Sequence, residues 1–224
     1  MTDMEAREQP KATSVLPRKR LWAVFVTVVA LTALGFFALG RLSAAPTVVP
    51  DAGPDAGFAR DMQTHHAQAV EMALLIRDKS ENPEVRAIAY DIATAQQHQN
   101  GQMFAWLQDW GLSQTGTAPP MAWMKADGTH DGAGASHGAP AAGGGNTMEG
   151  MATQEQMQAL RESSGAEAER LFVDLMIRHH QGGVAIATAG TRLAETSKVR
   201  DFAARILEAQ TAEIRALEEL RGRL

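Results

Sequence analysis

The hydrophobic pattern of this chain begins with a long apolar run that contains no charged residue. The run covers residues 21–40, about the length that a helix needs to cross the hydrocarbon core of a bilayer. It predicts a single transmembrane anchor at residues 21–42. Three basic residues precede the run and Arg41 alone follows it closely, so the tail of residues 1–20 is expected in the cytoplasm and the rest of the chain outside it. A cleaved signal peptide is the alternative, because small residues follow the run.

Past a stalk at residues 43–54 that is rich in Ala, Pro and Val, the apolar positions recur with the period of a helix. Asn82 followed by Pro83 is typical of a helix start, and Gly111 is typical of a helix end. Residues 55–111 are therefore predicted to form a first αα-hairpin. The positions on its first apolar face are 58, 62, 65, 66, 69, 72, 73 and 76.

A second helical stretch covers residues 153–224. The spacing of Thr and Gln at 153–156, and of Ser and Glu at 164–167, predicts two capping boxes. Thr196 or Ser197 is expected to begin the last helix. The stretch therefore predicts a short helix followed by a second αα-hairpin. Residues 112–152, which lie between the hairpins, have no such period and contain a run rich in Gly and Ala, so they predict a flexible linker.

The two helical stretches repeat each other. A shift of 114 positions aligns them without a gap and pairs Phe58 with Phe172 and Met62 with Met176. An αα-hairpin with one apolar seam can bury that seam only against a second hairpin. The repeat therefore predicts an all-α four-helix bundle with a long crossover. Pairing of hairpins from two chains is the alternative.

Four of the seven histidines lie in two adjacent pairs at equivalent positions of the repeat, His65–His66 and His179–His180. At 100° per residue both pairs face the bundle interior. Ala69 and Gly183 lie on the same line and should let the two helices approach closely. The other inward residues expected near this level are Met62, Met72, Gln96, Gln99 and Met103 in the first half, Met176, Gln210 and Glu213 in the second, and the borderline Asp61.

Composition narrows the chemistry of this interior layer. The absence of cysteine excludes disulfides and thiolate metal sites. A net charge of −5 and no basic patch past residue 60 argue against a nucleic-acid partner. Buried imidazoles then remain either as a hydrogen-bonded layer that fixes the register of the helices or as ligands of a metal ion.

Imidazole together with thioether suits copper, above all Cu(I), although Cu(II) and other transition metals also accept such ligands. A di-iron or di-manganese bundle would need several inward carboxylates, and only Glu213 and Asp61 qualify. We therefore expect a metal site with His65, His66, His179 and His180 as ligands, Met62, Met72 and Met176 as additional soft ligands, and Asp61, Gln96, Gln99, Met103, Gln210 and Glu213 as outer or further ligands. The methionines could instead be plain core residues. Further Met residues, with His130 and His137, lie in the linker, where they could capture Cu(I) or be a chance of composition.

The segments DAGFARDMQTHHAQAVEMA and SGAEAERLFVDLMIRHHQGGVAIA resemble the duplicated HH-motif family catalogued as domain of unknown function 305. The resemblance covers residues 51–224 apart from the middle of the linker. It implies a ferritin-like four-helix bundle that is commonly secreted or membrane-anchored in bacteria and is often associated with copper handling. Ile186 stands where the family often has methionine. The positions that the resemblance marks as functional are Asp61, Met62, His65, His66, Gln68, Glu71, Met72, Met176, His179, His180 and Gly183.

These observations favour a single-pass protein of the bacterial cell membrane whose extracytoplasmic domain sequesters copper, passes it on or confers resistance to it. Its partners would be the membrane, the metal ion and either a second copy of the chain or a copper-handling protein. One alternative is a metal-dependent oxidoreductase of the ferritin-like class that uses Glu213 or Asp61 as its acid-base group. Another is an interaction module that has a purely structural polar layer and no metal.

Overall fold

The computed structural model describes residues 18–43, 48–127 and 148–224, which are helical with connecting turns and contain no strand. The chain divides into two compact units, Met1–Thr47 and Val48–Leu224. The prediction of an all-α fold with one N-terminal apolar helix is therefore confirmed.

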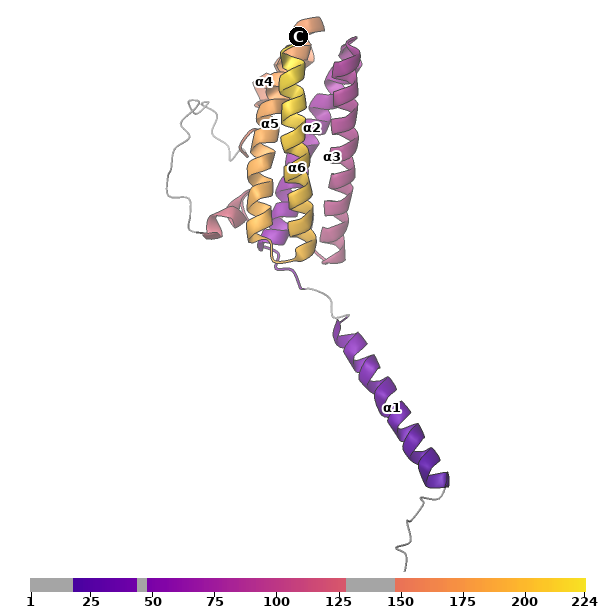
Figure 1. Cartoon of the computed structure of the whole chain (residues 1–224). Helices are drawn as coiled ribbons and strands as arrows, with labels where there is room; N and C mark the ends of the chain where they lie inside the picture. The colour runs from indigo at the N-terminus through magenta and orange to yellow at the C-terminus, as the bar shows by residue number, and fades with distance from the viewer. Residues whose placement is uncertain (1–17, 44–47, 128–147) are drawn as a thin grey trace, which may run out of the picture. The chain divides into compact units, whose positions relative to one another are not determined.

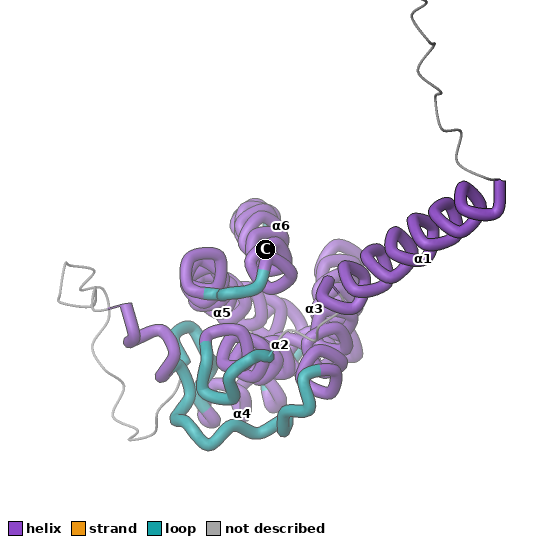
Figure 2. Tube along the Cα trace, turned by 90° about the horizontal axis from the view of Figure 1, so that it is seen from below, coloured by secondary structure: helices purple, strands orange, loops and turns teal. Residues whose placement is uncertain are grey.

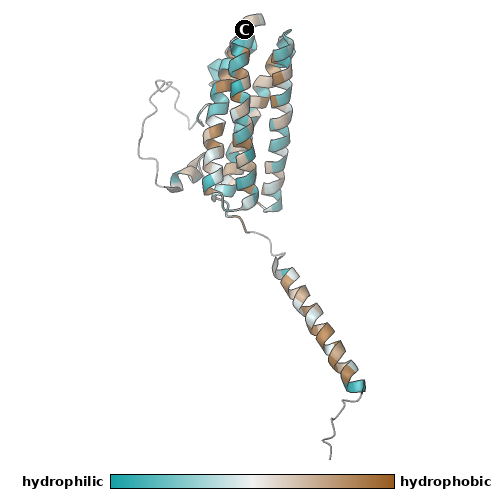
Figure 3. Ribbon diagram, in the orientation of Figure 1, coloured by the Kyte–Doolittle hydropathy of each residue, from teal (hydrophilic) through white to brown (hydrophobic). Residues whose placement is uncertain are grey.

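The first unit contains α1, Arg18–Ser43. Its segment Arg18–Arg41 is long and apolar enough to cross a membrane by length and composition. Figure 3 shows hydrophobic residues along most of α1, in contrast to the mixed surfaces of the other long helices. An uncleaved anchor and a signal sequence share these properties, so the predicted anchor stays a prediction.

The first hairpin consists of α2, Pro54–Lys79, and α3, Pro83–Asp109. The Asn82 side chain accepts hydrogen bonds from the first turn of α3, and a proline occupies the start of the helix, as the sequence predicts. At the other end Gly111 has a φ of 69°. The N–H of Leu112 then reaches back to the carbonyl of Leu107 at 2.8 Å, which is the glycine-dependent helix ending that the pattern indicates.

The second half consists of α4, Gln154–Glu162, α5, Gly165–Leu193, and α6, Ser197–Arg221. The capping box of Thr153 is present, and Thr196 caps α6. The second predicted box is wrong, because the Ser164 side chain makes no capping hydrogen bond. Gly165 follows it with a φ of 55°, so the backbone turns sharply there and does not present the first N–H groups of α5 to the hydroxyl.

The four long helices α2, α3, α5 and α6 form one bundle in which α2 packs on α3 and α5, and α5 packs on α6. Figure 1 shows them side by side, and Figure 2 shows the same helices close to end-on. Phe58, near the start of α2, lies against Gly190, near the end of α5. The two HH helices therefore run antiparallel, and the two hairpins of one chain pair with each other around a pseudo-twofold axis.

The repeat extends to the hairpin turns. Arg200 donates to the carbonyl groups of Ala194 and Glu195 at 2.9 and 2.8 Å, at the end of α5. Its equivalent in the first half, Arg86, donates to the carbonyl groups of Arg77 and Ser80 at the end of α2. Each arginine therefore satisfies carbonyls that a helix end leaves without partners.

Part of the predicted linker is packed on the bundle. A 3₁₀ helix, η1, spans Ala122–Asp127, and the Trp123 side chain is buried against Phe58. The prediction of a flexible linker at residues 112–152 is therefore wrong for these residues, because Trp123 is held against Asp61 and Phe58 of α2. The Gly- and Ala-rich run at 132–146, His130 and His137 lie outside the described residues.

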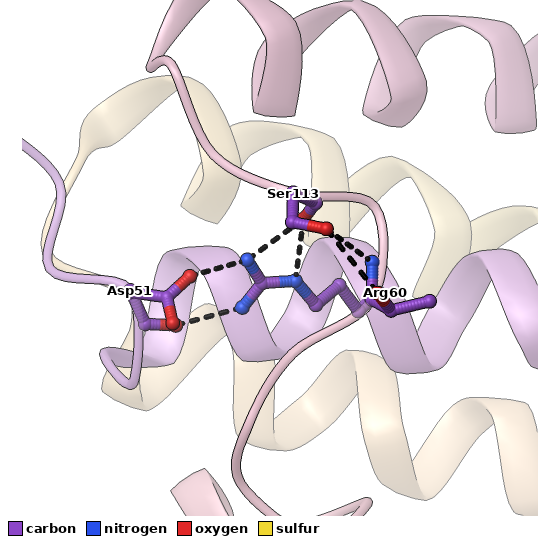
Figure 4. Close-up of polar contacts among 4 residues, drawn as sticks. Asp51, Arg60 and Ser113 are labelled. Atoms are coloured by element: carbon purple, nitrogen blue, oxygen red, sulfur yellow. Dashed lines mark hydrogen bonds and ion pairs between the residues drawn. The ribbon is translucent and has the colours of Figure 1, made fainter.

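One arginine forms hydrogen bonds with the segments before and after the first hairpin. Arg60 of α2 donates to the Asp51 carboxylate at 2.5 Å and to the Asp51 carbonyl at 2.7 Å, before α2 begins. It also donates to the Ser113 carbonyl at 3.0 and 2.8 Å, after α3 ends. Figure 4 shows the guanidinium group between the two segments. The chain on either side of the hairpin is thereby held against α2.

Candidate functional site

Four histidines meet in one interior layer of the bundle. His65, His66, His179 and His180 have no exposed surface. The rings of His65 and His179, one from each half, lie with centroids 3.7 Å apart. Within each pair the centroids lie 6.5 Å apart for His65–His66 and 6.3 Å apart for His179–His180. The inward direction of both histidine pairs, which helix periodicity and the repeat predict, is thus the one that the structure has.

The layer separates two apolar clusters. One cluster includes Met72, Ile76, Phe172 and Met176, and the other includes Met62 and residues of all four long helices. Met62, Met72, Met103 and Met176 are fully buried. The repeat therefore carries Met62 and Met176 to opposite sides of the histidines, because the pseudo-twofold axis inverts the direction of the second half.

In each half, one histidine forms a hydrogen bond with a side chain on the other helix of the same hairpin. In the first half His66 Nε2 lies 2.7 Å from Gln99 Oε1. In the second half His180 Nε2 lies 2.6 Å from Glu213 Oε2. Gln99 and Glu213 are equivalent positions of the repeat, as are the two histidines. The layer is thus symmetric in its imidazoles and asymmetric in the groups that hold them.

Many buried nitrogen and oxygen atoms of this layer have no protein hydrogen-bond partner among the described residues. A buried polar atom without a partner costs about 1–3 kcal/mol. A layer with this many such atoms is therefore costly unless another group binds to them. The residues whose atoms are affected are His65 and His179 at both ring nitrogens, His66 and His180 at Nδ1, and Gln96 and Gln210 at both amide atoms.

Burial favours the neutral form of His65, His66 and His179. Desolvation, with a smaller effect of the nearby His180, lowers the pKa of His65 to about 3. The nearby backbone of Glu149 partly opposes this lowering of the pKa. Its geometry falls short of a regular hydrogen bond to the His65 ring. Desolvation and the neighbouring His65 lower the pKa of His66 to about 3, and burial also lowers the pKa of His179 well below its ordinary value. Neutral imidazole is the form that binds metal ions.

Gly183 makes room for a side chain of its own hairpin. A Cβ atom at Gly183 would lie 2.1 Å from Gln210 Oε1. The expectation that Gly183 lets α2 and α5 approach each other is therefore wrong in its reason, because the space is filled by the Gln210 amide. At Gly190 of α5 the close neighbour is a side chain of α2, because a Cβ there would lie 2.7 Å from the Phe58 ring.

The layer is covered on one side by the end of the linker, which the sequence analysis did not foresee. Gln68 of α2 forms two hydrogen bonds with the backbone of Ala152, at 2.9 and 2.7 Å. A Cβ at Gly182 of α5 would lie only 2.0 Å from the carbonyl oxygen of Glu149. The side chain of Met148 is buried. The only signals for this contact in the sequence are the adjacent glycines of α5 and a glutamine beside the histidine pair.

Two acidic residues near the motif prove to have other partners. Asp61 accepts hydrogen bonds from the Met121 N–H and the Trp123 indole N–H, both at 2.8 Å. Burial raises its pKa above the ordinary value, which these hydrogen bonds partly oppose. Asp61, the borderline residue that the sequence analysis expects as an outer or further ligand, is therefore held by η1 and the residue before it instead. Glu71, which the family resemblance marks as functional, is exposed and pairs with Arg161 of α4.

Replacing Asp61 with Ala should destabilise the domain by about 1–3 kcal/mol, because the buried indole N–H of Trp123 and the partly buried N–H of Met121 lose their acceptor. Urea unfolding measures the change. Asp91→Ala, at an exposed position of α3, is the matched control and should change stability by less than about 0.5 kcal/mol. Equal stabilities of the two variants would show that η1 is not anchored through Asp61.

The layer is not a ready-made polydentate site. Across residues 18–43, 48–127 and 148–224, no group of three or more His, Asp or Glu side chains is arranged to hold a metal ion. The donors available are pairs of imidazoles, two inward amides and the buried thioethers. A donor set of this kind fits a soft ion that accepts few ligands, and does not fit a hard ion that needs many oxygens.

A membrane-type helix and a duplicated αα-hairpin bundle with a buried histidine layer define the class of this protein. The chain belongs to the DUF305 family, a domain of unknown function, whose pattern matches residues 55–221. No curated protein matches the chain.

Several solved structures share the fold. A DUF305 protein from Streptomyces coelicolor is 37% identical, with a TM-score of 0.66 over 77% of this chain and 96% of that one. A DUF305 fragment from Deinococcus radiodurans is 31% identical, with a TM-score of 0.60 over 80% of this chain and all of that one. CopM in its Cu(I)-bound form is 22% identical, with a TM-score of 0.55 over 75% of this chain and 96% of that one.

Proposed function

We propose that the bundle binds copper outside the cytoplasm and sequesters it, passes it on or confers resistance to it. The observation that carries this proposal is the layer of four fully buried histidines, six of whose eight ring nitrogens have no protein partner among the described residues. A structural layer would be expected to satisfy its own polar atoms. Among the described residues, the imidazoles of this layer find partners only at Nε2 of His66 and Nε2 of His180.

The chemistry of the donors supports copper over other metals. Imidazole nitrogens and thioether sulfurs together favour Cu(I), and imidazole also suits Cu(II). His65, His66, His179 and His180 would be the ligands, with Met62, Met72, Met103 and Met176 as the available thioethers. Gln96 and Gln210 would line the site.

The comparisons support the same proposal at the level of the fold. CopM has been solved in Cu(I)-bound, Cu(II)-bound and Ag-bound forms. Its similarity to this chain is one of fold, so the proposal depends on the histidine layer itself.

We also propose that α1 anchors the domain, with residues 1–20 in the cytoplasm and the bundle outside. The supporting observations are the apolar segment Arg18–Arg41 and the basic residues that precede it. The DUF305 protein from Streptomyces coelicolor is described as a proposed secreted protein, and a location beyond the cytoplasm suits this proposal.

An oxidoreductase of the ferritin-like class has less support. Among the described residues, Glu213 is the one carboxylate that hydrogen-bonds to a histidine of the layer. Asp61 is directed toward η1. Ferritin-like di-metal sites use several inward carboxylates, and this layer has imidazoles and amides in their place.

Copper titration of the full-length chain in detergent tests the proposal. We expect the wild-type protein to bind Cu(I) against a competing chelator, and the His65→Gln/His66→Gln/His179→Gln/His180→Gln variant to lose this binding. The matched control is His98→Gln, because His98 is exposed on α3. It should bind like the wild type. Circular dichroism of each variant establishes that the helices are retained.

Thermal melting separates the metal site from a structural layer. Because a ligand that binds only the folded state raises its stability, copper should raise the melting temperature of the wild type and of His98→Gln, but not that of the four-histidine variant. If the wild type binds no copper, or the four-histidine variant binds it equally well, the proposal is wrong.

A further inference from the structure

The two halves of the layer differ at one pair of equivalent positions. Gln99 holds His66 in the first half, and Glu213 holds His180 in the second, at nearly equal distances of 2.7 and 2.6 Å. The repeat has therefore preserved the geometry of these contacts while changing the charge of one partner. Glu213 is partly exposed at the edge of the layer, with 26% of its side-chain surface accessible, whereas the His180 side chain is fully buried.

The carboxylate determines which ring nitrogen of His180 carries the proton. A carboxylate oxygen accepts hydrogen bonds, so the ring nitrogen beside Glu213, Nε2, donates the hydrogen of this contact. In the tautomer that carries its hydrogen on Nε2, Nδ1 keeps its lone pair. Nδ1 is the atom that has no protein partner. The contact thus leaves a lone pair inside the layer that is free to bind an ion.

The first half has the same arrangement with a neutral partner. Gln99 presents its carbonyl oxygen, Oε1, to His66 Nε2, and an amide oxygen is also an acceptor. His66 Nδ1 likewise has no protein partner among the described residues. Proteins commonly orient a metal-binding histidine in this way, by a hydrogen bond from its other ring nitrogen to a carboxylate or a carbonyl.

We infer that Gln99 and Glu213 are positioning residues that direct Nδ1 of His66 and His180 to the ion, and that Glu213 makes the second half the one that takes a divalent ion first. The inference rests on the proposed copper function. Coulomb attraction grows in proportion to the charge of the ion, so the carboxylate favours Cu(II) more strongly than Cu(I). The neutral Gln99 half has no such preference.

The tautomer can be measured in the metal-free protein. Long-range proton–nitrogen NMR of full-length protein labelled at histidine should show hydrogen on Nε2 of His180 and of His66. Hydrogen on Nδ1 of His180 would overturn the inference, whether or not the protein binds copper. Wild-type protein that bound no copper would instead overturn the proposed function, and the two failures are thus distinguishable.

Exchange of the two partners tests the effect of charge. Glu213→Gln keeps the shape of the side chain and should weaken Cu(II) binding by about 10-fold to 100-fold, the usual effect of losing such an outer contact, with a smaller change for Cu(I). Gln99→Glu should strengthen Cu(II) binding. Unchanged Cu(II) affinity in a folded Glu213→Gln protein would overturn the inference, because a purely structural contact would not discriminate between oxidation states.

The order in which the two halves of the layer bind Cu(II) can also be measured. Cu(II) is paramagnetic, so substoichiometric Cu(II) should broaden the His180 signals before those of His66 in the wild type. In Glu213→Gln/Gln99→Glu, which moves the carboxylate to the first half, His66 should broaden first. An order that stayed the same after the exchange would show that the carboxylate does not set it.

Discussion

Acidification of the metal-free protein from pH 7 to pH 5 should destabilise the bundle by about 2 kcal/mol for each of His65 and His66. Their pKa is about 3 in the folded chain, compared with 6.5 in the unfolded chain. Between these two values the unfolded state binds more protons, so stability falls as the pH falls. His179, whose pKa burial also lowers, acts in the same direction. Above about pH 6.5 these groups should leave stability constant.

Chemical denaturation across this pH range measures the effect. Asp61 acts in the opposite direction, because its pKa is raised in the folded chain, but it is one group against three. His65→Gln/His179→Gln should have a shallower pH dependence than the wild type. His98→Gln, at an exposed position, should match the wild type. A stability that is equal at pH 7 and pH 5 would contradict the burial of neutral imidazoles.

Replacing Gly182 with Ala should have the second large effect. The new Cβ atom would lie 2.0 Å from the carbonyl oxygen of Glu149 and 2.6 Å from its carbonyl carbon. These are backbone atoms, which cannot move aside as a flexible side chain can. Overpacking of this kind costs about 1–3 kcal/mol. We expect a lower free energy of unfolding and faster hydrogen exchange at residues 148–152, where the linker leaves the layer.

Gly101→Ala is the matched control for this substitution. Gly101 is also a helical glycine, exposed on α3, and a Cβ there would meet nothing within 4 Å. Because alanine favours a helix over glycine, this variant should be more stable by about 0.5–1 kcal/mol. The two substitutions are thus expected to have opposite signs. A stabilising Gly182→Ala would show that the linker does not lie against α5.

The regular part of the fold could be predicted because it depends on periodicity. A helix turns by a fixed angle per residue, so the positions of His65 and His66 determined their inward direction without any knowledge of neighbours. The repeat then placed His179 and His180 in the same layer. Gln99 and Glu213 followed from the antiparallel pairing of helices within each hairpin.

The irregular contacts could not be predicted because each depends on a single side chain. Nothing in the spacing of Asp61 shows that it would bind the indole of Trp123 rather than face His65. The two hydrogen bonds of Gln68 join residues far apart in the sequence, and no period links them. A tryptophan in an otherwise turn-rich segment is the one local sign that part of the linker is buried.

The internal duplication has a consequence for how the two halves can differ. Two identical hairpins assembled as a homodimer would present the same side chain at both equivalent positions, because the symmetry of the dimer allows nothing else. Joining the hairpins in one chain removes this constraint. One half can then acquire an acid at residue 213 while the other keeps an amide at residue 99. Covalent fusion therefore permits the two halves of the histidine layer to differ in charge while they keep the same arrangement of imidazoles.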